Sequence, residues 1–325
     1  MTEYRVVVRR PGGVDQFAVE DLEVLTPAAG EVLIRHTAIG LNYIDVYHRS
    51  GLYPTPTDTD FVIGAEAAGV IEALGDGVDD LAVGQRVVYT APFNAYQTHR
   101  TLPADLAVPL PDNVDDVTAA ASCLKGLTVR YLIFDSYPAR SGDTVLFHAA
   151  AGGVGLIAGQ WLQALGVNAI GTAGTEEKCA LARDFGYEFA INYREVSFVH
   201  EIERLTDGEG VSAVYDGVGK DTYPGSLDCL KRFGTFVSFG QSSGPAANFK
   251  IADLARGSLR LQRPTLFHYT EDRRWLQDGA AELYRHIGDG VIRIQPPNEL
   301  GLKDVAKAHM ALESRKTSGS TVLIP

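Results

Sequence analysis

The sequence of 325 residues predicts an α/β protein in which a β-rich part is followed by a doubly wound parallel sheet. Two observations carry this prediction. Up to about residue 125, short apolar runs are separated by clusters of Gly, Pro and Asp, which is typical of a compact barrel or sandwich of short strands. From Asp143 onward, buried apolar strands alternate with amphipathic helical segments, and such crossover helices join parallel strands.

The β-rich part, residues 1–125, shows both strand and helix patterns. Helices are predicted at 42–49 and 115–124, and the acidic residues at the start of the second helix suit the helix dipole. Strands are predicted at 31–41, 66–74 and 85–90.

Residues 126–263 form the predicted second domain. Its strands are expected at 144–150, 168–173, 189–193, 212–218 and 235–241. Its helices are expected at 153–166, 175–186, 197–208 and 221–234, and three of them close on a glycine that can take the left-handed cap. The remaining segment, 264–325, is expected to return to the first domain and complete it. Its elements are a strand at 263–269, helices at 272–287 and 302–312, and a last strand at 321–325.

Composition excludes several classes of protein. The net charge of -12 would repel a polyphosphate backbone, so nucleic acid is not expected as the main partner. No run approaches the roughly 18 consecutive apolar residues of a membrane-spanning helix, and charges occupy the amino end where a signal peptide has its apolar core. Three cysteines without CxxC spacing predict neither a disulfide framework nor a cysteine-built zinc site. We therefore expect a cytoplasmic protein with no membrane partner.

The segment AAAGGVG, Ala149–Gly155, follows a predicted strand and opens a predicted helix. It matches the dinucleotide fingerprint at Ala150, Gly152 and Gly155, with alanine in the first glycine position. Backbone at Ala151 and Gly152 can then approach a pyrophosphate, and amides at the helix start would face the phosphates. The alternative is a glycine-rich turn needed only for packing. The flanking strand and helix and the further βα pairs favour a bound dinucleotide.

The end of the next strand predicts which dinucleotide binds. Here the sequence is GTAGTEEK, with no acid at Ala173 or Gly174 to hold a ribose diol. Lys178 could meet a 2′-phosphate, for which the small residues Gly174 and Thr175 leave room. The alternative is that Lys178 forms a solvated pair with the neighbouring glutamates. These residues favour NADPH over NADH.

No metal site is predicted, because the eight histidines stand singly and lack HxxxH or CxxC partners. A nicotinamide carries its own reactivity, so the protein needs to place the ring, exclude water and donate a hydrogen bond. The candidate catalytic residues are Asn42, Asp45, Tyr47 and Tyr53. The alternative is that Asn42 caps a helix and the tyrosines are half-buried core. We interpret His148, Cys123 and Cys229 as core residues.

The order of GAEAAGVIEALGDGV, GQRV and GDTVLFHAAAGGVGLIAGQW resembles the medium-chain dehydrogenase/reductase superfamily, and within it the quinone oxidoreductase (zeta-crystallin) family. The likeness continues through NYIDVYHRSGLYP, AASCLKGLTVRYL, AINYRE and LESRKTSGSTVLIP, so it covers the whole chain. Members of the superfamily with catalytic zinc carry Cys at the position of Asn42 and His at that of Ala65. The resemblance therefore implies the zinc-free branch.

The resemblance also implies a homodimer. Each subunit would have a GroES-like catalytic domain, made from both chain ends, and a Rossmann domain, with NADPH in the cleft. Lys178 and Tyr193 would flank the 2′-phosphate. The implied cofactor contacts are Tyr43, Ile44, Asp45, Val46, Tyr47, Tyr131, Gly153, Val154, Gly174, Thr175, Glu176, Glu177, Lys178, Tyr193, Val218, Phe239, Gly240, Gln241, Ser242, Pro264, Thr265, Leu266 and Arg315.

The implied activity is zinc-independent transfer of electrons or hydride from NADPH to a quinone. A second hypothesis is reduction of an enone carbon–carbon double bond, which uses the same cofactor and a different proton donor. A third, from another class, is a nucleotide-binding structural (crystallin-like) or RNA-binding protein. The acidic net charge counts against RNA.

Overall fold

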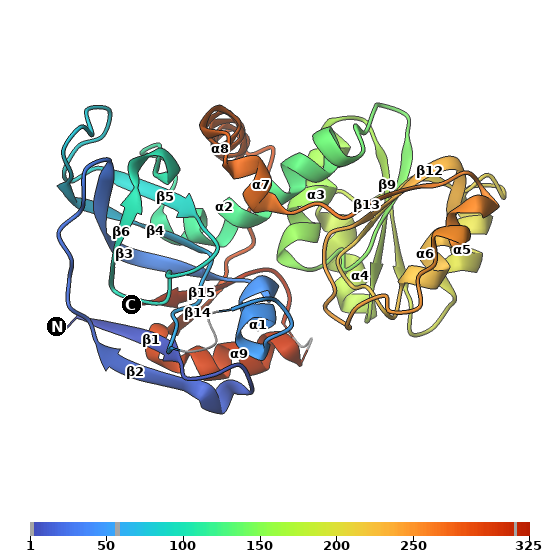
Figure 1. Cartoon of the computed structure of the whole chain (residues 1–325). Helices are drawn as coiled ribbons and strands as arrows, with labels where there is room; N and C mark the ends of the chain where they lie inside the picture. Colours follow the sequence, from blue (N-terminus) through green and yellow to red (C-terminus); the bar gives the residue numbers. More distant parts are fainter. Residues whose placement is uncertain (1–2, 56–58, 315–316) are drawn as a thin grey trace. The chain divides into compact units, whose positions relative to one another are not determined.

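The computed structural model describes residues 3–55, 59–314 and 317–325. The chain divides into two compact units. The first comprises residues 1–127, 267–289 and 294–325, so both ends of the chain contribute to it (Figure 1). The second comprises residues 128–266 and 290–293. Arg315, an expected cofactor contact, lies outside the described residues.

The first unit is built on a seven-stranded sheet and a two-stranded one. The large sheet has the order β14-β15-β3-β4-β5-β7, and β6 pairs with β3. Its core consists of inward-facing Val, Ile, Leu and Tyr side chains such as Ile34, Ile71 and Tyr89. The small sheet pairs β1 (Tyr4–Val8) with β2 (Phe17–Asp21) in antiparallel register. The strands of the large sheet are β3 (Glu31–Leu41), β4 (Glu66–Leu74), β5 (Arg86–Thr90), β6 (His99–Pro103), β7 (Val108–Pro109), β14 (Asn298–Gly301) and β15 (Thr321–Ile324).

The helices of the first unit include α1, which follows β3 directly. Asn42 is its N-cap, and Gly51 closes it with a φ of 80°, a left-handed conformation that favours glycine. The α-helices are α1 (Tyr43–Ser50), α2 (Asp116–Arg130), α7 (Leu266–Thr270), α8 (Arg273–Gly288) and α9 (Val305–Glu313). Short 3₁₀ turns cover Val14–Gln16, Ala104–Leu106 and Leu302–Asp304. Helix α2 begins in the first unit and continues into the second, where a π-helical turn, Tyr131–Ser136, follows it.

The segment Asp116–Ser136 is long and apolar enough to cross a membrane by length and composition, with a mean hydropathy of 1.3. However, 72% of its most apolar window is buried in the folded chain. Core helices of folded proteins meet the same criterion, so this segment is weak evidence for a membrane span.

The second unit is a parallel six-stranded sheet of order β10-β9-β8-β11-β12-β13. Strands β8, β9 and β10 follow one another toward one edge of the sheet, and β11, β12 and β13 follow one another from β8 toward the other edge. This reversal of direction beside β8 is typical of a doubly wound sheet. Helices α3 and α4 cover one face and α5 and α6 the other (Figure 1). The strands are β8 (Thr144–Phe147), β9 (Asn168–Ala173), β10 (Phe189–Asn192), β11 (Val211–Asp216), β12 (Leu230–Ser238) and β13 (Arg260–Gln262). The helices are α3 (Gly153–Ala164), α4 (Glu176–Asp184), α5 (Phe198–Leu205) and α6 (Tyr223–Asp228), with a 3₁₀ helix at Ile251–Arg256.

Three glycines close α3, α4 and α5 in the left-handed region, as the sequence predicts. Gly166, Gly186 and Gly208 have φ values of 72°, 97° and 80°. Left-handed backbone costs an L side chain energy and glycine very little, so these positions fix where each helix ends.

Two predictions for the second half of the chain are wrong. The expected strand at 263–269 is instead the short helix α7, because β12 ends at Ser238 and Pro264 has no N–H to extend the pairing of β13. The expected helix at 221–234 ends at Asp228. Val211 donates its N–H to the carbonyl of Cys229, so sheet pairing begins as soon as α6 ends.

Candidate functional site

The glycine-rich segment forms a tight turn between β8 and α3. Ala149 has a φ of 56°, and the Gly152 N–H donates to its carbonyl at 2.9 Å. Ala150 can occupy the first glycine position because Gly171 on the adjacent strand has no side chain. A Cβ on Gly171 would lie 2.6 Å from the Ala150 Cβ. The departure from the usual fingerprint is therefore compensated by a second glycine one strand away.

Gly155 lets α3 pack closely on this turn. A Cβ at this position would lie 2.5 Å from the carbonyl oxygens of both Ala149 and Ala150. The Tyr187 hydroxyl donates to the Gly155 carbonyl at 2.8 Å and fixes the helix from its other side. The first N–H bonded within the helix is that of Leu156, so the preceding amides and the dipole of this twelve-residue helix can face an anion. Gly152, Gly153 and Val154 are partly exposed and Ala151 is buried beneath them.

The carboxyl ends of β11 and β12 are held by Asp216, which is wholly buried. Its carboxylate accepts the N–H groups of Val218 at 2.7 Å and Gly219 at 3.0 Å, and its carbonyl accepts the Phe239 N–H at 2.9 Å. The segment Phe239–Ser242 continues from β12, and the Ser242 N–H donates to the Gly217 carbonyl. Because β8, β11 and β12 are parallel neighbours, these segments and the glycine-rich turn share one edge of the sheet.

A basic cluster of Lys178 and Arg194 lies at the end of β9, around Gly174. A Cβ on Gly174 would lie 2.7 Å from the Tyr193 hydroxyl and 3.4 Å from Arg194 Nε. Thr175 caps α4, its hydroxyl accepting the Lys178 N–H at 3.3 Å. Partial burial and the charge of Arg194 lower the pKa of Lys178. Two neighbouring cations beside a phenol and a glycine suit a phosphate group.

Two further observations bear on this basic cluster. Glu176 is ion-paired with Arg183, which directs that carboxylate along its own helix. The sequence prediction missed Arg194, although it directly follows Tyr193 at the end of the next strand. Its position was the available signal, because residues after parallel strands gather at one edge.

The other expected cofactor contacts fall into two groups. Pro264, Thr265 and Leu266 follow the edge strand β13, and Tyr131 opens the π-helical turn with its side chain buried. The remaining group, Tyr43, Ile44, Asp45, Val46 and Tyr47, is the first turn and a half of α1 in the first unit.

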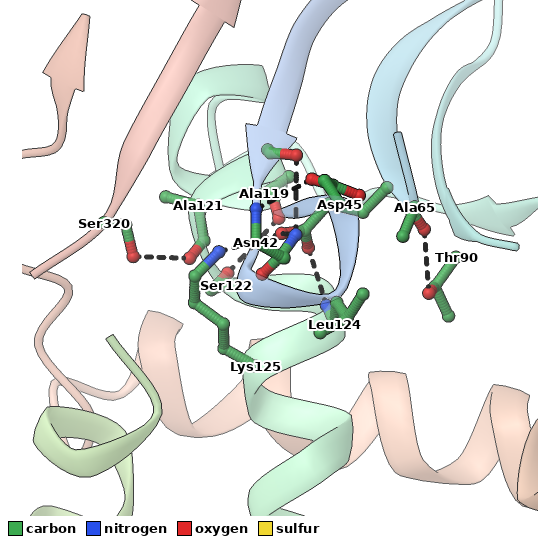
Figure 2. A network of polar contacts seen from close by, with 12 residues as sticks. Asn42, Asp45, Ala65, Thr90, Ala119, Ala121, Ser122, Leu124, Lys125 and Ser320 are labelled. Carbon is green, nitrogen blue, oxygen red and sulfur yellow. Dashed lines mark hydrogen bonds and ion pairs between the residues drawn. The ribbon is translucent and has the colours of Figure 1, made fainter. Parts of the chain in front are cut away.

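Asn42 and Glu66 form the centre of a buried polar network in the first unit. Glu66 is wholly buried, and its Oε1 accepts from Asn42 Nδ2 at 2.8 Å and from Lys125 Nζ at 2.9 Å. Its Oε2 accepts the Leu124 N–H at 2.7 Å. Asn42, Leu124 and Lys125 thus converge from α1 and α2 (Figure 2).

The amide orientation of Asn42 follows from these partners, because a carboxylate paired with a lysine accepts hydrogen bonds and cannot donate them. Nδ2 therefore faces Glu66, and its second hydrogen points toward the Gly40 carbonyl at 3.4 Å. Both amide hydrogens have acceptors within the protein, and the residue also caps α1. Asn42 is thus held as a structural element of the site.

Asp45 is wholly buried beneath α1. Its Oδ2 accepts the backbone N–H of Asn42 at 2.8 Å and the Tyr96 hydroxyl at 3.0 Å. Its Oδ1 is buried without a hydrogen-bond partner among the described residues. Burial raises the pKa of Asp45 to about 7, although its hydrogen bonds act in the opposite direction. The Tyr96 hydroxyl also contacts His309 Nε2 at 3.1 Å, and burial lowers the pKa of that histidine to about 3.

Aromatic side chains cover the outer part of α1. The rings of Tyr47 and Tyr53 have centroids 5.0 Å apart, and those of Tyr43 and Tyr47 are 6.0 Å apart. His48 packs on Phe93 with centroids 4.4 Å apart. Tyr43 and Tyr53 are partly exposed, unlike Asn42 and Asp45. Of the four candidate catalytic residues, Tyr47 is buried like Asn42 and Asp45, and Tyr53 is partly exposed. Tyr53 is therefore better situated to contact a planar ligand.

The residues interpreted as core are buried. His148 Nδ1 and Nε2 contact the hydroxyls of Thr172 and Ser226 at 2.8 and 3.0 Å, which satisfies both ring nitrogens. Burial raises the pKa of the Cys123 and Cys229 thiols, to about 12 for Cys229. Across the described ranges, no group of three or more His, Cys, Asp or Glu side chains could hold a metal ion.

Comparison with known proteins gives consistent matches over both units. Family models match the alcohol dehydrogenase GroES-like domain at residues 28–112 and the zinc-binding dehydrogenase domain at 153–278. The chain is 45% identical over 325 residues to a quinone oxidoreductase of Salmonella typhimurium, covering 99% of both chains. It is 40% identical over 327 residues to 2-haloacrylate reductase of a Burkholderia species, covering 98% of both. The crystal structure of Escherichia coli quinone oxidoreductase complexed with NADPH matches with a TM-score of 0.97 and 43% identity, covering 99% of this chain and all of that one.

Replacing Asp45 with Asn is expected to change how stability depends on pH. Because its pKa of about 7 in the folded state exceeds the value in an unfolded chain, the folded state binds the proton more tightly. The resulting stabilisation is full below about pH 4 and is lost as the pH rises to about 7. Between pH 5 and pH 8, the unmodified protein should therefore lose about 2–3 kcal/mol of unfolding free energy relative to Asp45→Asn.

Urea denaturation at both pH values measures this difference. Asp79→Asn, at an exposed position of the same unit, is the control. Parallel pH profiles for all three proteins would contradict the raised pKa of Asp45.

Proposed function

We propose, because this chain belongs to the quinone oxidoreductase family of the medium-chain dehydrogenases and reductases, that it is an NADPH-dependent quinone oxidoreductase. The predicted fold, a GroES-like domain with a Rossmann-type parallel sheet, is confirmed by the family and structure matches. We assign the first unit to the GroES-like domain and the second to the Rossmann domain. The observation that carries the function is the glycine-rich turn together with the basic cluster of Lys178 and Arg194 at one sheet edge, in a chain this similar to quinone oxidoreductases.

The residues of the second unit fit NADPH. We infer that backbone at Gly152–Val154 binds the pyrophosphate, and that Lys178 and Tyr193 bind the 2′-phosphate. Support comes from the close approach that Gly155 permits and from Gly174, where a Cβ would lie 2.7 Å from the Tyr193 hydroxyl. When bound, NADPH supplies a hydride to the substrate.

For the first unit we propose a division of labour along α1. Tyr53 contacts the substrate, Tyr47 supports the Tyr53 ring from the protein side, and Asn42 and Asp45 are positioning residues that fix the start of the helix. The burial of Asn42 and Asp45 and the hydrogen bonds of Asn42 Nδ2 and Asp45 Oδ2 support this division. The roles proposed for these four residues involve no metal ion, and the side chain of Ala65 has no atom that could coordinate one. We therefore infer turnover without zinc.

A second candidate function is reduction of an activated carbon–carbon double bond. The observation that favours it is the 40% identity to a 2-haloacrylate reductase over nearly the full chain. Both reactions use the same cofactor. They differ in that the double-bond reduction needs a proton delivered to carbon.

We further propose a homodimer that forms through the edge of the parallel sheet. Strand β13 is an edge strand, paired with β12 on one side within the described residues. Leu261 on β13 and Phe233 on β12 are exposed apolar side chains near this edge. Unpaired strand edges bearing apolar residues are common sites of pairing between chains.

We also infer a cytoplasmic protein without a membrane partner. The burial of the apolar segment Asp116–Ser136 supports this inference.

Replacing Lys178 with Ala should lower the affinity for NADPH at least tenfold and leave the affinity for NADH nearly unchanged. Only NADPH carries the phosphate that the lysine can meet, and a tenfold loss corresponds to about 1.4 kcal/mol. Fluorescence titration with both cofactors measures this. Lys250→Ala, an exposed lysine of the same unit, is the matched control. Equal losses for NADPH and NADH would rule out the assignment of Lys178.

The substrate class is tested by NADPH oxidation rates with a panel of quinones and enones, in the presence and absence of a chelator. We expect turnover with quinones, unaffected by the chelator. Tyr53→Phe should lower this turnover moderately, roughly tenfold to a thousandfold, as for the loss of one oriented hydrogen bond. Fast enone turnover that collapses in Tyr53→Phe, with no quinone turnover in the unmodified protein, would establish the second candidate instead.

The assembly is tested by light scattering of the purified protein. We expect a mass near twice the 35.0 kDa of the chain. Leu261→Asp should shift it toward the monomer by placing a charge at the paired edge. A monomeric mass for the unmodified protein at micromolar concentration would exclude the proposed dimer.

A further inference from the structure

Lys125 is a buried cation next to the start of α1. Its side chain is 7% exposed and pairs with Glu66, which is 0% exposed. Lys125 Nζ and Asn42 Nδ2 donate to the same oxygen of that carboxylate, so the ammonium lies close to the N-cap of α1 (Figure 2). Gly40 makes room for the arrangement, because a Cβ there would lie 2.2 Å from Glu66 Oε1.

Stability alone does not explain a lysine at this place. Removing two charges from water is costly, and well-packed apolar residues often replace a buried ion pair without loss of stability. The two side-chain donors of the network also differ in how many of their N–H groups have an acceptor. Both amide hydrogens of Asn42 have acceptors, whereas Lys125 has three N–H groups and, within the described part of the chain, one acceptor. Lys125 is therefore the donor in this network with capacity for a ligand.

We propose that Lys125 is a catalytic residue whose ammonium donates a hydrogen bond to the quinone oxygen and stabilises the negative charge that develops there. This inference rests on the proposed function, because it requires a quinone bound at the start of α1. A fixed cation in a water-poor site needs no reorganisation as the charge develops, which is what makes such a donor effective.

The step is balanced without a further reactant. When bound, NADPH would supply a hydride, that is two electrons and one proton, to one quinone oxygen and would leave as NADP+. An O–H bond would form there, and the negative charge would develop on the other quinone oxygen, which Lys125 contacts. A proton from water then completes the hydroquinone. Lys125 keeps its own proton throughout, and Glu66 holds the ammonium in place.

The test uses the full chain with Lys125→Met combined with Glu66→Gln, since this pair of changes leaves no unpaired charge in the core. Glu66→Gln alone retains the ammonium and reports the effect of altering the network. Lys307→Met, an exposed lysine of the same unit, is the matched control. Thermal unfolding and NADPH titration establish that each variant is folded and binds cofactor.

Two readouts are measured. The first is kcat/KM with a quinone, which should fall a hundredfold to a thousandfold in the double variant and less than tenfold in Glu66→Gln. The second is the pKa of bound 4-nitrophenol, whose ionised oxygen resembles that of a reduced quinone. It should be higher in the double variant than in the unmodified protein, and not raised in Glu66→Gln.

Quinone turnover within threefold of the unmodified protein in the double variant, or an unchanged pKa of bound 4-nitrophenol, would overturn the role of Lys125. If the unmodified protein reduces no quinone, the proposed function fails by itself. The 4-nitrophenol titration then still decides whether Lys125 faces a bound oxyanion.

Discussion

The buried carboxylate of Glu66 is the interaction on which the first unit's site depends. It accepts three hydrogen bonds, from Asn42, from the backbone of Leu124 and from Lys125, and so joins β4, the start of α1 and the middle of α2. An unpaired carboxylate at this depth would be prohibitively costly, so all three donors must be in place when the chain is folded. This requirement fixes the orientation of the Asn42 amide and the position of α1, and it leaves Gly as the residue that fits at position 40.

In the second unit, the site depends on the close approach of the backbone of α3 to the turn after β8. Gly155 brings α3 onto the turn after β8, Gly171 makes room for Ala150, and Tyr187 bonds the Gly155 carbonyl from behind. The result is a helix start whose amides can face an anion at the carboxyl edge of a parallel sheet. Electrostatics at the same edge are supplied by Lys178 and Arg194, whose mutual repulsion a phosphate would relieve. Backbone packing therefore holds the amides of α3 and the two cations in place, and these groups gain favourable interactions when an anionic ligand binds.

The two kinds of polar residue on and around α1 differ in a way that bears on chemistry. Asn42 Nδ2 and Asp45 Oδ2 form hydrogen bonds within the fold, and burial raises the pKa of Asp45 to about 7. Tyr43 and Tyr53 each pack against Tyr47, and both are partly exposed, so they offer aromatic surface. A planar quinone needs contact area and a fixed charge more than it needs an acid or a nucleophile. Around α1, the tyrosine rings offer contact area and the buried Lys125 offers a charge.

The sequence by itself determined the features that depend on consecutive residues. The strand, turn and helix around Ala149–Gly155, the missing acid at Gly174 and the glycine caps follow from local backbone preferences, which short patterns encode directly. The prediction failed at 221–234, where pairing with β11 begins directly after α6, and at 263–269, where the pairing of β13 with β12 ends at Gln262. Only the tertiary structure decided the rest. Asn42 and Lys125 meet Glu66 across 24 and 59 residues of chain, and Tyr96 meets His309 across 213. Such meetings depend on strand register and helix packing, which no single segment specifies.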